Sequence, residues 1–410
     1  MLQKTVLDNG LIIITERDDN IKTVTISCTI KCGSYNENAD NRGIAHFTEH
    51  MLFKGTINRT AKQISEDIEG IGGILNAETS FEHTKYHVTV LSECWEKGIE
   101  VLSDLVWNNL IPEEEFKKEK QVILEELKMY DDNPGAKIFD LLFKRMFPNY
   151  PNRQFVGGTI ESVSQISRDQ MINFIDTFYV PSNIIIVAAG NIDHDKLVDF
   201  IQSYSSNIDF KTGNLSTEKT EFNPSSLIGP DLSEKKEIQQ SHLSWGLFGP
   251  KPSDDDYAVG EIMACILGGN SSSRLYQIIR EEKGLAYTIR MDAQGVSDIG
   301  FLSGYVGLDG NSIDAVKKII FSELDKVKNE DISDEELERA KAYVKGTTMI
   351  YFERTSSRNS YVVNCLITLT DPNIEHFINK IEKVTIKDLR EFANKYFQED
   401  NICFVEITPK

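Results

Sequence analysis

The chain has 410 residues, of which 40% are hydrophobic and 26% are charged. This balance is typical of a folded protein and excludes a chain that is disordered throughout. The formal net charge of −20 argues against nucleic acid or an acidic membrane surface as a partner, because both are bound through clustered Lys and Arg side chains. The length is sufficient for two domains that each bury a core of their own.

The start of the chain and its cysteines bear on cellular location. The first residues contain no basic segment followed by a long apolar stretch, so we expect no signal peptide. The most apolar segments, such as residues 184–189, are far shorter than the ~20 residues that cross a bilayer. The six cysteines include no CxxC pair, so we expect reduced thiols and a cytoplasmic protein without a membrane segment.

Strand-like and helix-like segments are mixed along the first half of the chain. A hairpin is predicted at the start, because the turn sequence Asp8-Asn9-Gly10 separates two apolar runs. Further strands are predicted at residues 24–31, 74–77 and 85–91, and helices at residues 45–53, 61–68, 96–109 and 113–130. This mixture with hairpin signals favours an α+β fold over a doubly wound parallel sheet.

A polar segment near the middle of the chain is typical of an interdomain linker. We therefore expect an N-terminal catalytic domain at residues 1–215, a linker at residues 216–236 and a C-terminal domain at residues 237–410.

The two sides of this linker repeat one pattern. Residues 166–187 match residues 384–405 at a spacing of 218, as between Ile184 and Ile402. Residues 111–116 match residues 332–337 at the nearly equal spacing of 221. The repeat predicts a duplicated fold, although coincidence between generic amphipathic helices is the alternative explanation.

The most informative residues are His46-Phe47-Thr48-Glu49-His50. On a helix, the two histidines lie one turn apart on one face, and Glu49 lies beside them. Two neutral imidazoles in this arrangement suit Zn²⁺, and a neighbouring carboxylate can accept a proton from metal-bound water. The alternative is a helix whose histidines only face solvent or the core.

A catalytic zinc needs a third protein ligand, and the helix predicted at residues 113–130 offers candidates. Glu119 and Glu126 are seven residues apart and share one face of that helix. Glu125 points about 100° away and is the weaker candidate. A solvated face of a Glu/Lys-rich helix is the alternative for each of these glutamates.

These residues resemble the inverzincins, the pitrilysin-type zinc metallopeptidases that include the mitochondrial processing peptidase and its small bacterial relatives. The similarity covers nearly the whole chain, including residues 43–55, residues 75–86 and the helix that carries Glu119 and Glu126. The resemblance implies an α+β protein of two homologous domains with the same topology, each a mostly antiparallel sheet packed with helices.

The resemblance also implies roles for individual residues. His46, His50 and Glu126 are expected to bind one Zn²⁺ per chain, with Glu49 as general base and Glu119 as a second glutamate that supports catalysis. In the second half, Arg280 and Tyr287 are expected to reach the substrate at the zinc site. Ala340 and Thr347 stand where the first half has Glu119 and Glu126, so no second metal site is expected.

The function implied is a zinc-dependent endopeptidase that hydrolyses extended peptides or unfolded segments inside a clamshell chamber. Asn76 and Ala77 match the family's edge strand, which adds the substrate as a further strand. We expect a homodimer in which the C-terminal domain of one chain faces the zinc of its partner.

Two other functions remain open at this stage. One is a non-catalytic scaffold or partner subunit of the same family, although the intact set of His46, Glu49, His50 and Glu126 argues against it. The other is a binding protein with a structural zinc, which would need a fourth ligand that no Cys or His evidently supplies.

Overall fold

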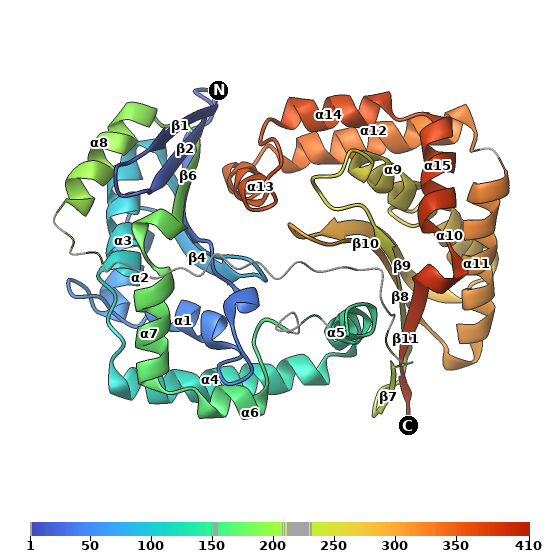
Figure 1. Cartoon of the computed structure of the whole chain (residues 1–410), viewed down its shortest axis with the longest axis horizontal. Helices are drawn as coiled ribbons and strands as arrows, with labels where there is room; N and C mark the ends of the chain where they lie inside the picture. The colour runs from blue at the N-terminus through green and yellow to red at the C-terminus, as the bar shows by residue number, and fades with distance from the viewer. Residues whose placement is uncertain are drawn as a thin grey trace. The chain divides into compact units, whose positions relative to one another are not determined.

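Two separate β-sheets organise the chain (Figure 1). In this computed structural model the described residues are 2–148, 150, 155–206, 208, 210, 229, 232–330 and 332–410. The chain divides into two compact units, each built around one of the sheets. Unit 1 comprises Met1–Met129, Pro151–Lys219 and Tyr351–Ile367, and unit 2 comprises Tyr130–Tyr150, Thr220–Ile350 and Thr368–Lys410.

Unit 1 contains a six-stranded sheet in the order β1-β2-β6-β3-β5-β4. Only β2 and β6 pair in parallel, and the other neighbours are antiparallel. The last strand, β4, forms one edge of the sheet. The strands are β1 (Leu2–Val6), β2 (Ile12–Arg17), β3 (Thr23–Ile30), β4 (Ile74–Thr79), β5 (Thr84–Leu91) and β6 (Ile184–Gly190).

Helices cover both faces of this sheet. Alternate residues of β6 explain why: Ile184 and Ile186 belong to the main core, whereas Ile185 and Val187 pack with Val362 of α13. The helices of unit 1 are α1 (Ile44–Leu52), α2 (Ala61–Glu69), α3 (Trp95–Trp107), α4 (Glu113–Asp132), α6 (Ile160–Gln165), α7 (Arg168–Phe178), α8 (His194–Ser205) and α13 (Thr355–Ile367). The end of α4 continues into unit 2.

Unit 2 contains a five-stranded sheet in the order β7-β11-β8-β10-β9. Its strands are β7 (Leu232–Lys236), β8 (Ser241–Gly249), β9 (Ala286–Gly295), β10 (Gly300–Leu308) and β11 (Ile402–Pro409). Its helices are α5 (Pro134–Met146), α9 (Tyr257–Leu267), α10 (Arg274–Tyr276), α11 (Ile313–Asn329), α12 (Asp334–Tyr351), α14 (Ile374–Lys383) and α15 (Ile386–Tyr396).

The two sheets share one topology, which confirms the predicted duplicated α+β fold. The order β2-β6-β3-β5-β4 in unit 1 corresponds to β7-β11-β8-β10-β9 in unit 2, and the single parallel pair occurs at the same place in both. β6 and β11 begin at Ile184 and Ile402, at the predicted spacing of 218 residues. α4 and α12 begin at Glu113 and Asp334, at the predicted spacing of 221.

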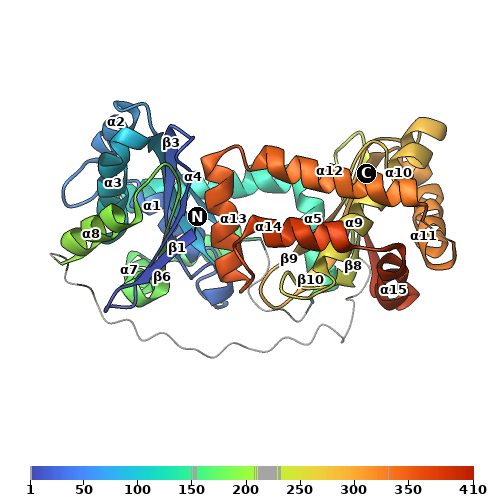
Figure 2. The ribbon, with the colours of Figure 1, turned by 90° about the horizontal axis from the view of Figure 1, so that it is seen from above.

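The units are not contiguous in sequence, because corresponding helices are exchanged. α5 belongs to the first half of the chain but packs on β8 and β11, whereas α13 comes from the second half and packs on β3 and β6 (Figures 1 and 2). The buried Asn359 of α13 fixes this arrangement by donating to the carbonyl oxygens of Val187, at 2.8 Å, and Thr25, at 3.3 Å.

The predicted boundaries therefore need correction. A division into residues 1–215 and 237–410 assigns both exchanged helices to the wrong unit, because an amphipathic pattern shows that a helix has an apolar face but not which sheet it meets. Within the predicted linker at residues 216–236, Leu232–Lys236 form β7, which pairs in parallel with β11. The other linker residues, except Gly229, lie outside the described residues.

Two further expectations can be compared with the structure. The six cysteines, all of them among the described residues, form no disulfide bond in the structure. No helix in the described ranges is long and apolar enough to cross a membrane.

Two buried carboxylates hold the ends of α1, the helix that carries the His-x-x-Glu-His motif. At its start, Glu37 accepts hydrogen bonds from the backbone N–H groups of Gly43 and Ala45, at 2.9 and 3.0 Å. After its end, the buried Asp104 of α3 accepts from the Thr56 hydroxyl and from Arg59, at 2.6 and 2.7 Å. The Glu37 contacts hold the first turn of α1, and the Asp104 contacts hold the loop that follows the helix. Together they fix the position of α1.

Replacement of Asp104 should destabilise this loop in a pH-dependent way. Burial alone would raise the pKa of Asp104, but hydrogen bonds from Thr56, Asn108, Asn58 and Arg59 lower it below its usual value. The stabilisation is therefore complete at neutral pH and is lost as the pH falls below about 4. Asp104→Asn should lower the free energy of unfolding by about 2 kcal/mol at pH 7.

Urea unfolding of the wild type and the variant at pH 7, together with thermal melting from pH 7 to pH 3, measures this difference. The difference in stability between the wild type and Asp104→Asn should become smaller in acid. Asp195→Asn, which changes an exposed residue of α8, should have little effect on stability. A difference in stability between wild type and Asp104→Asn that is the same at every pH would contradict this explanation.

Candidate metal centre

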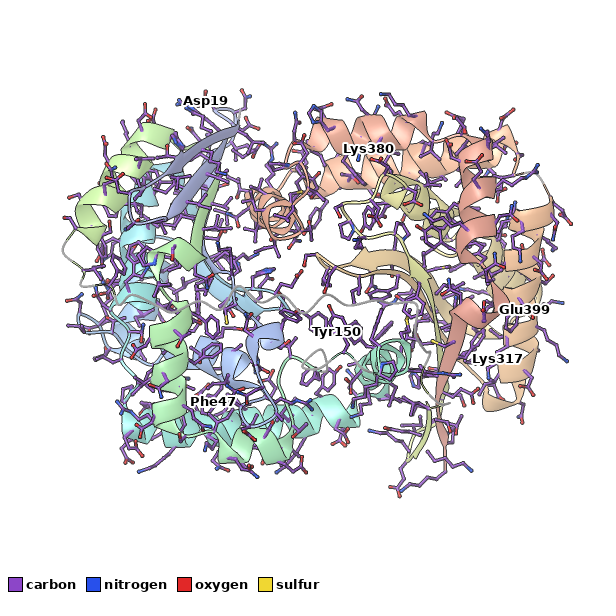
Figure 3. All side chains as sticks on the ribbon, in the orientation of Figure 1. Asp19, Phe47, Tyr150, Lys317, Lys380 and Glu399 are labelled. Carbon is purple, nitrogen blue, oxygen red and sulfur yellow. The ribbon has the colours of Figure 1, made fainter. Side chains whose placement is uncertain are left out.

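The candidate metal centre lies where α1 meets α4. Phe47, labelled in Figure 3, points from α1 toward α4, where its ring stacks on that of Phe116 with the ring centroids 4.8 Å apart. On the same helix, the rings of His46 and His50 lie 4.6 Å apart, as expected for residues separated by one turn. The packing of the two helices therefore brings this histidine pair next to the carboxylates of α4.

The structure places Glu126 opposite both histidines. The Nε2 atoms of His46 and His50 lie 3.9 and 3.6 Å from the nearest Glu126 oxygens. One ligand atom from each of these three residues lies within 4.8 Å of the other two. Ligand atoms around a tetrahedral zinc, with bonds of about 2.0–2.2 Å, are about 3.3 Å apart. The donor set and its spacing therefore fit Zn²⁺ with small adjustments.

The geometry also shows where Glu125, the weaker candidate, lies and how many protein ligands the site offers. Glu125 points away and pairs with Lys128 at 2.7 Å, as the helical spacing predicts. Among the residues that the structure describes, this is the only group of three or more metal-ligating side chains, and it contains no fourth member. Glu126 is about half exposed. Three protein ligands with one side open to solvent are typical of a catalytic zinc site.

His46 is suited to metal binding by its protonation state. Burial, and secondly the nearby His50, lower the pKa of His46 to about 4. The imidazole is therefore neutral at physiological pH, which is the form that binds metals. Its Nδ1 atom is buried and has no hydrogen-bond partner in the described part of the protein.

Glu119 orients His50 from the side opposite Glu126. Its Oε1 atom lies 2.9 Å from His50 Nδ1, and its Oε2 atom lies 2.7 Å from the Lys54 ammonium. Burial alone would raise the pKa of Glu119, but the hydrogen bonds with His50 and Lys54 lower it. The ionised carboxylate must accept the proton of Nδ1, which leaves Nε2 of His50 free to face the metal position.

Glu49 lies on α1 between the two histidines and is largely buried. Burial raises its pKa, and a hydrogen bond from the Thr79 hydroxyl to Oε2 opposes that rise. Thr79 is the last residue of β4, the edge strand. Asn76 and Ala77 lie on the same strand, and the Asn76 side-chain oxygen accepts from the Ala77 N–H at 2.9 Å.

The remaining predicted site residues, Arg280 and Tyr287, belong to unit 2. The Arg280 guanidinium lies over the rings of Tyr276 and Tyr287, at 5.0 and 4.5 Å from their centroids. It also donates to the Tyr287 carbonyl oxygen at 3.1 Å. The Tyr287 side chain is largely exposed. The two residues thus form one cluster, and their role toward a substrate remains a prediction.

The sequence did not single out Lys54 or Thr79. Lys54 lies in the segment 43–55 and Thr79 lies in the segment 75–86, so both are in regions with a clear family resemblance. Neither has a spacing that would predict contact with a particular glutamate. Their partners, Glu119 and Glu49, become evident only when α4 and β4 are placed beside α1.

Loss of the Glu119 carboxylate should weaken zinc binding. Glu119→Gln removes the ionic acceptor that orients His50, and such changes reduce metal affinity by about 10- to 100-fold. Competition with a chromophoric chelator measures the dissociation constant. Glu125→Gln, on the exposed side of the same helix, is the matched control and should bind zinc like the wild type. Equal affinities for all three proteins would contradict the role of Glu119.

Comparison with known proteins identifies the family of the chain and agrees with the fold. The family described as insulinase (peptidase family M16) matches residues 12–159, and the family described as the peptidase M16 inactive domain matches residues 165–344. An uncharacterized zinc protease of Bacillus subtilis is 33% identical over 401 residues, which cover 98% of this chain and 97% of that protein. One of Rickettsia felis is 34% identical and covers 87% and 85%.

Solved structures share the whole fold. A protease from Helicobacter pylori has a TM-score of 0.90 at 23% identity and covers 100% of this chain and 99% of its own. A chain of complex III2 from Candida albicans has a TM-score of 0.84 at 20% identity and covers 99% and 95%. From the matched families and the full-length relatives, the chain belongs to peptidase family M16.

Proposed function

We propose that this protein is a zinc-dependent endopeptidase that hydrolyses extended peptides or unfolded segments. The observation that carries the proposal is the group formed by His46, His50 and Glu126, with Glu49 beside it. A metal bound there has three protein ligands and a side open to solvent, next to a carboxylate that can act as a base. The chain therefore has the groups that peptide hydrolysis requires, on one pair of helices.

The comparisons support this proposal. The full-length relatives in Bacillus subtilis and Rickettsia felis are named zinc proteases. The second matched family is described as an inactive domain, and this agrees with the repeat, in which Ala340 and Thr347 of α12 replace Glu119 and Glu126 of α4. One metal site per chain follows from this asymmetry.

Zinc bound to His46, His50 and Glu126 would supply a Lewis acid that makes water nucleophilic near neutral pH and polarises the substrate carbonyl. Glu49 accepts the proton of the attacking water and delivers it to the departing amine nitrogen. The Lys54 ammonium keeps the Glu119 carboxylate ionised. That carboxylate accepts the hydrogen bond of the His50 Nδ1–H and so holds the ring in place during the reaction.

The substrate binds along β4. This strand is the edge of the unit 1 sheet, so a peptide can pair with it through main-chain hydrogen bonds. The Ala77 N–H is already bonded to the side chain of Asn76, and an incoming peptide carbonyl would replace that side chain. Because such binding requires an extended backbone, the enzyme should prefer unfolded segments to folded proteins.

The active form is a homodimer in which Arg280 and Tyr287 of one chain act at the zinc centre of the other. This arrangement gives the exposed cluster of unit 2 a role in stabilising the oxyanion of the tetrahedral intermediate. The inactive second domain then has a function, as a surface that completes the site of its partner.

Mixing two inactive variants tests this arrangement. Glu49→Gln chains retain Arg280 and Tyr287, whereas Arg280→Ala chains retain Glu49. An intact site therefore forms only in a mixed dimer, where the Arg280 of one chain meets the Glu49 of the other. We expect the mixture to recover a fraction of wild-type activity after subunit exchange, with each variant alone far less active. No recovery in a mixture that forms mixed dimers would show that these residues do not act across chains.

Glu49→Gln should abolish hydrolysis and leave zinc binding intact. The amide cannot accept a proton from water, so kcat for a quenched extended peptide should fall by at least about 100-fold. Zinc content, measured on the same preparation, should remain at one ion per chain. Glu125→Gln is the matched control on a glutamate outside the site and should be fully active.

A chelator distinguishes this function from a scaffold role, the second candidate raised by the shared fold with complex III2. Wild-type activity should disappear with chelation and return when zinc is restored. Stoichiometric zinc without hydrolysis of any extended peptide would contradict an enzymatic function and favour a scaffold.

A further inference from the structure

The edge strand β4 makes a direct contact with the carboxylate expected to act as the base. Along this strand, Leu75 and Ala77 pack against the main core of unit 1, whereas Asn76 and Glu78 face the other side. Thr79 follows the same alternation, and its hydroxyl donates a hydrogen bond to Oε2 of Glu49. The strand on which a peptide would dock therefore also touches Glu49.

This contact is the one side-chain hydrogen bond that Glu49 makes in the part of the chain that the structure describes. Glu49 is largely buried, and both histidines of the motif lie on the same helix. A glutamate held at one oxygen keeps a defined orientation, and its other oxygen stays available to accept a proton. Without that bond, rotation about the terminal torsion of the side chain would be broad.

The donor itself is rigidly placed. Thr79 pairs across the sheet with Thr84, whose hydroxyl donates to the Cys32 carbonyl oxygen at 2.9 Å. The next residue, Ser80, closes a turn in which its N–H donates to the His83 carbonyl oxygen at 2.8 Å. The backbone of Thr79 is thus held by the hairpin that joins β4 to β5.

We propose that Thr79 is a positioning residue that orients Glu49 for proton transfer and couples the base to the substrate-binding strand. The proposal rests on the proposed function, since it assigns Glu49 the role of base. Thr79 acts on the substrate only through Glu49. Its loss should therefore lower the rate of the chemical step more than it changes peptide binding.

Three variants test this role. Thr79→Val removes the hydroxyl but keeps the size and the β-branched shape that suit a strand. Thr79→Ser keeps the hydroxyl and should rescue the function. Thr89→Val makes the same change in the same sheet, at a hydroxyl that bonds to Thr25 at 2.8 Å, and serves as the control.

Steady-state kinetics on a quenched extended peptide provide the first readout. For Thr79→Val, kcat should fall about 10- to 100-fold while KM and zinc content stay within twofold of the wild type. Thr79→Ser and Thr89→Val should keep kcat within about threefold. A Thr79→Val enzyme with wild-type kcat, or one whose loss lies only in KM, would overturn the proposal.

Crystal structures of the wild type and Thr79→Val in the zinc-bound form provide a second readout that does not depend on activity. The Glu49 carboxylate should occupy one orientation in the wild type and several in the variant, with β4 unchanged. A single unchanged Glu49 orientation in Thr79→Val would refute the proposal. If the wild type hydrolyses no peptide, the proposed enzymatic function fails, and these structures still decide whether Thr79 orients Glu49.

Discussion

The concentration of charge where α1 packs on α4 is the constraint on which the rest of this site depends. Glu49, Glu119 and Glu126 surround two histidines, of which His46 is kept neutral by burial. When His50 is also neutral, these three glutamates carry three negative charges. Within this group of side chains, the ammonium of Lys54 supplies the one positive charge that balances them. A divalent cation held by the neutral imidazoles and Glu126 would make the group electrically neutral. Metal binding there would thus offset the cost of bringing these carboxylates together.

The two units share one arrangement of strands but differ in the residues of the candidate metal site. Both sheets have the same strand order and the same single parallel pair, but only unit 1 contains the histidine pair and the glutamates of α4. In α12, the corresponding positions are Ala340, which is buried, and Thr347, which is exposed. The exchange of α5 and α13 means that neither sheet is covered by its own half of the chain alone. Each compact unit therefore contains segments from both halves of the chain.

Much of the site could be predicted from local spacing. The positions of His46, Glu49 and His50 on one helix, and of Glu119 and Glu126 on another, follow from helical periodicity alone. The exchanged helices and the contacts of Thr79 and Lys54 could not be predicted in this way. They depend on which surfaces meet in the folded chain, and neither an amphipathic pattern nor a family motif specifies that pairing. Sequence therefore predicted the residues of the site better than the contacts that orient them.

We propose that two imidazoles of α1 and one carboxylate of α4 bind a common zinc ion. The zinc K-edge X-ray absorption spectrum of the purified protein tests it most directly. It should show two imidazole nitrogens and oxygen ligands at about 2.0–2.2 Å, with a spectrum that changes in Glu126→Gln. Sulfur scattering at about 2.3 Å, or a spectrum unaffected by replacing Glu126, would contradict the claim.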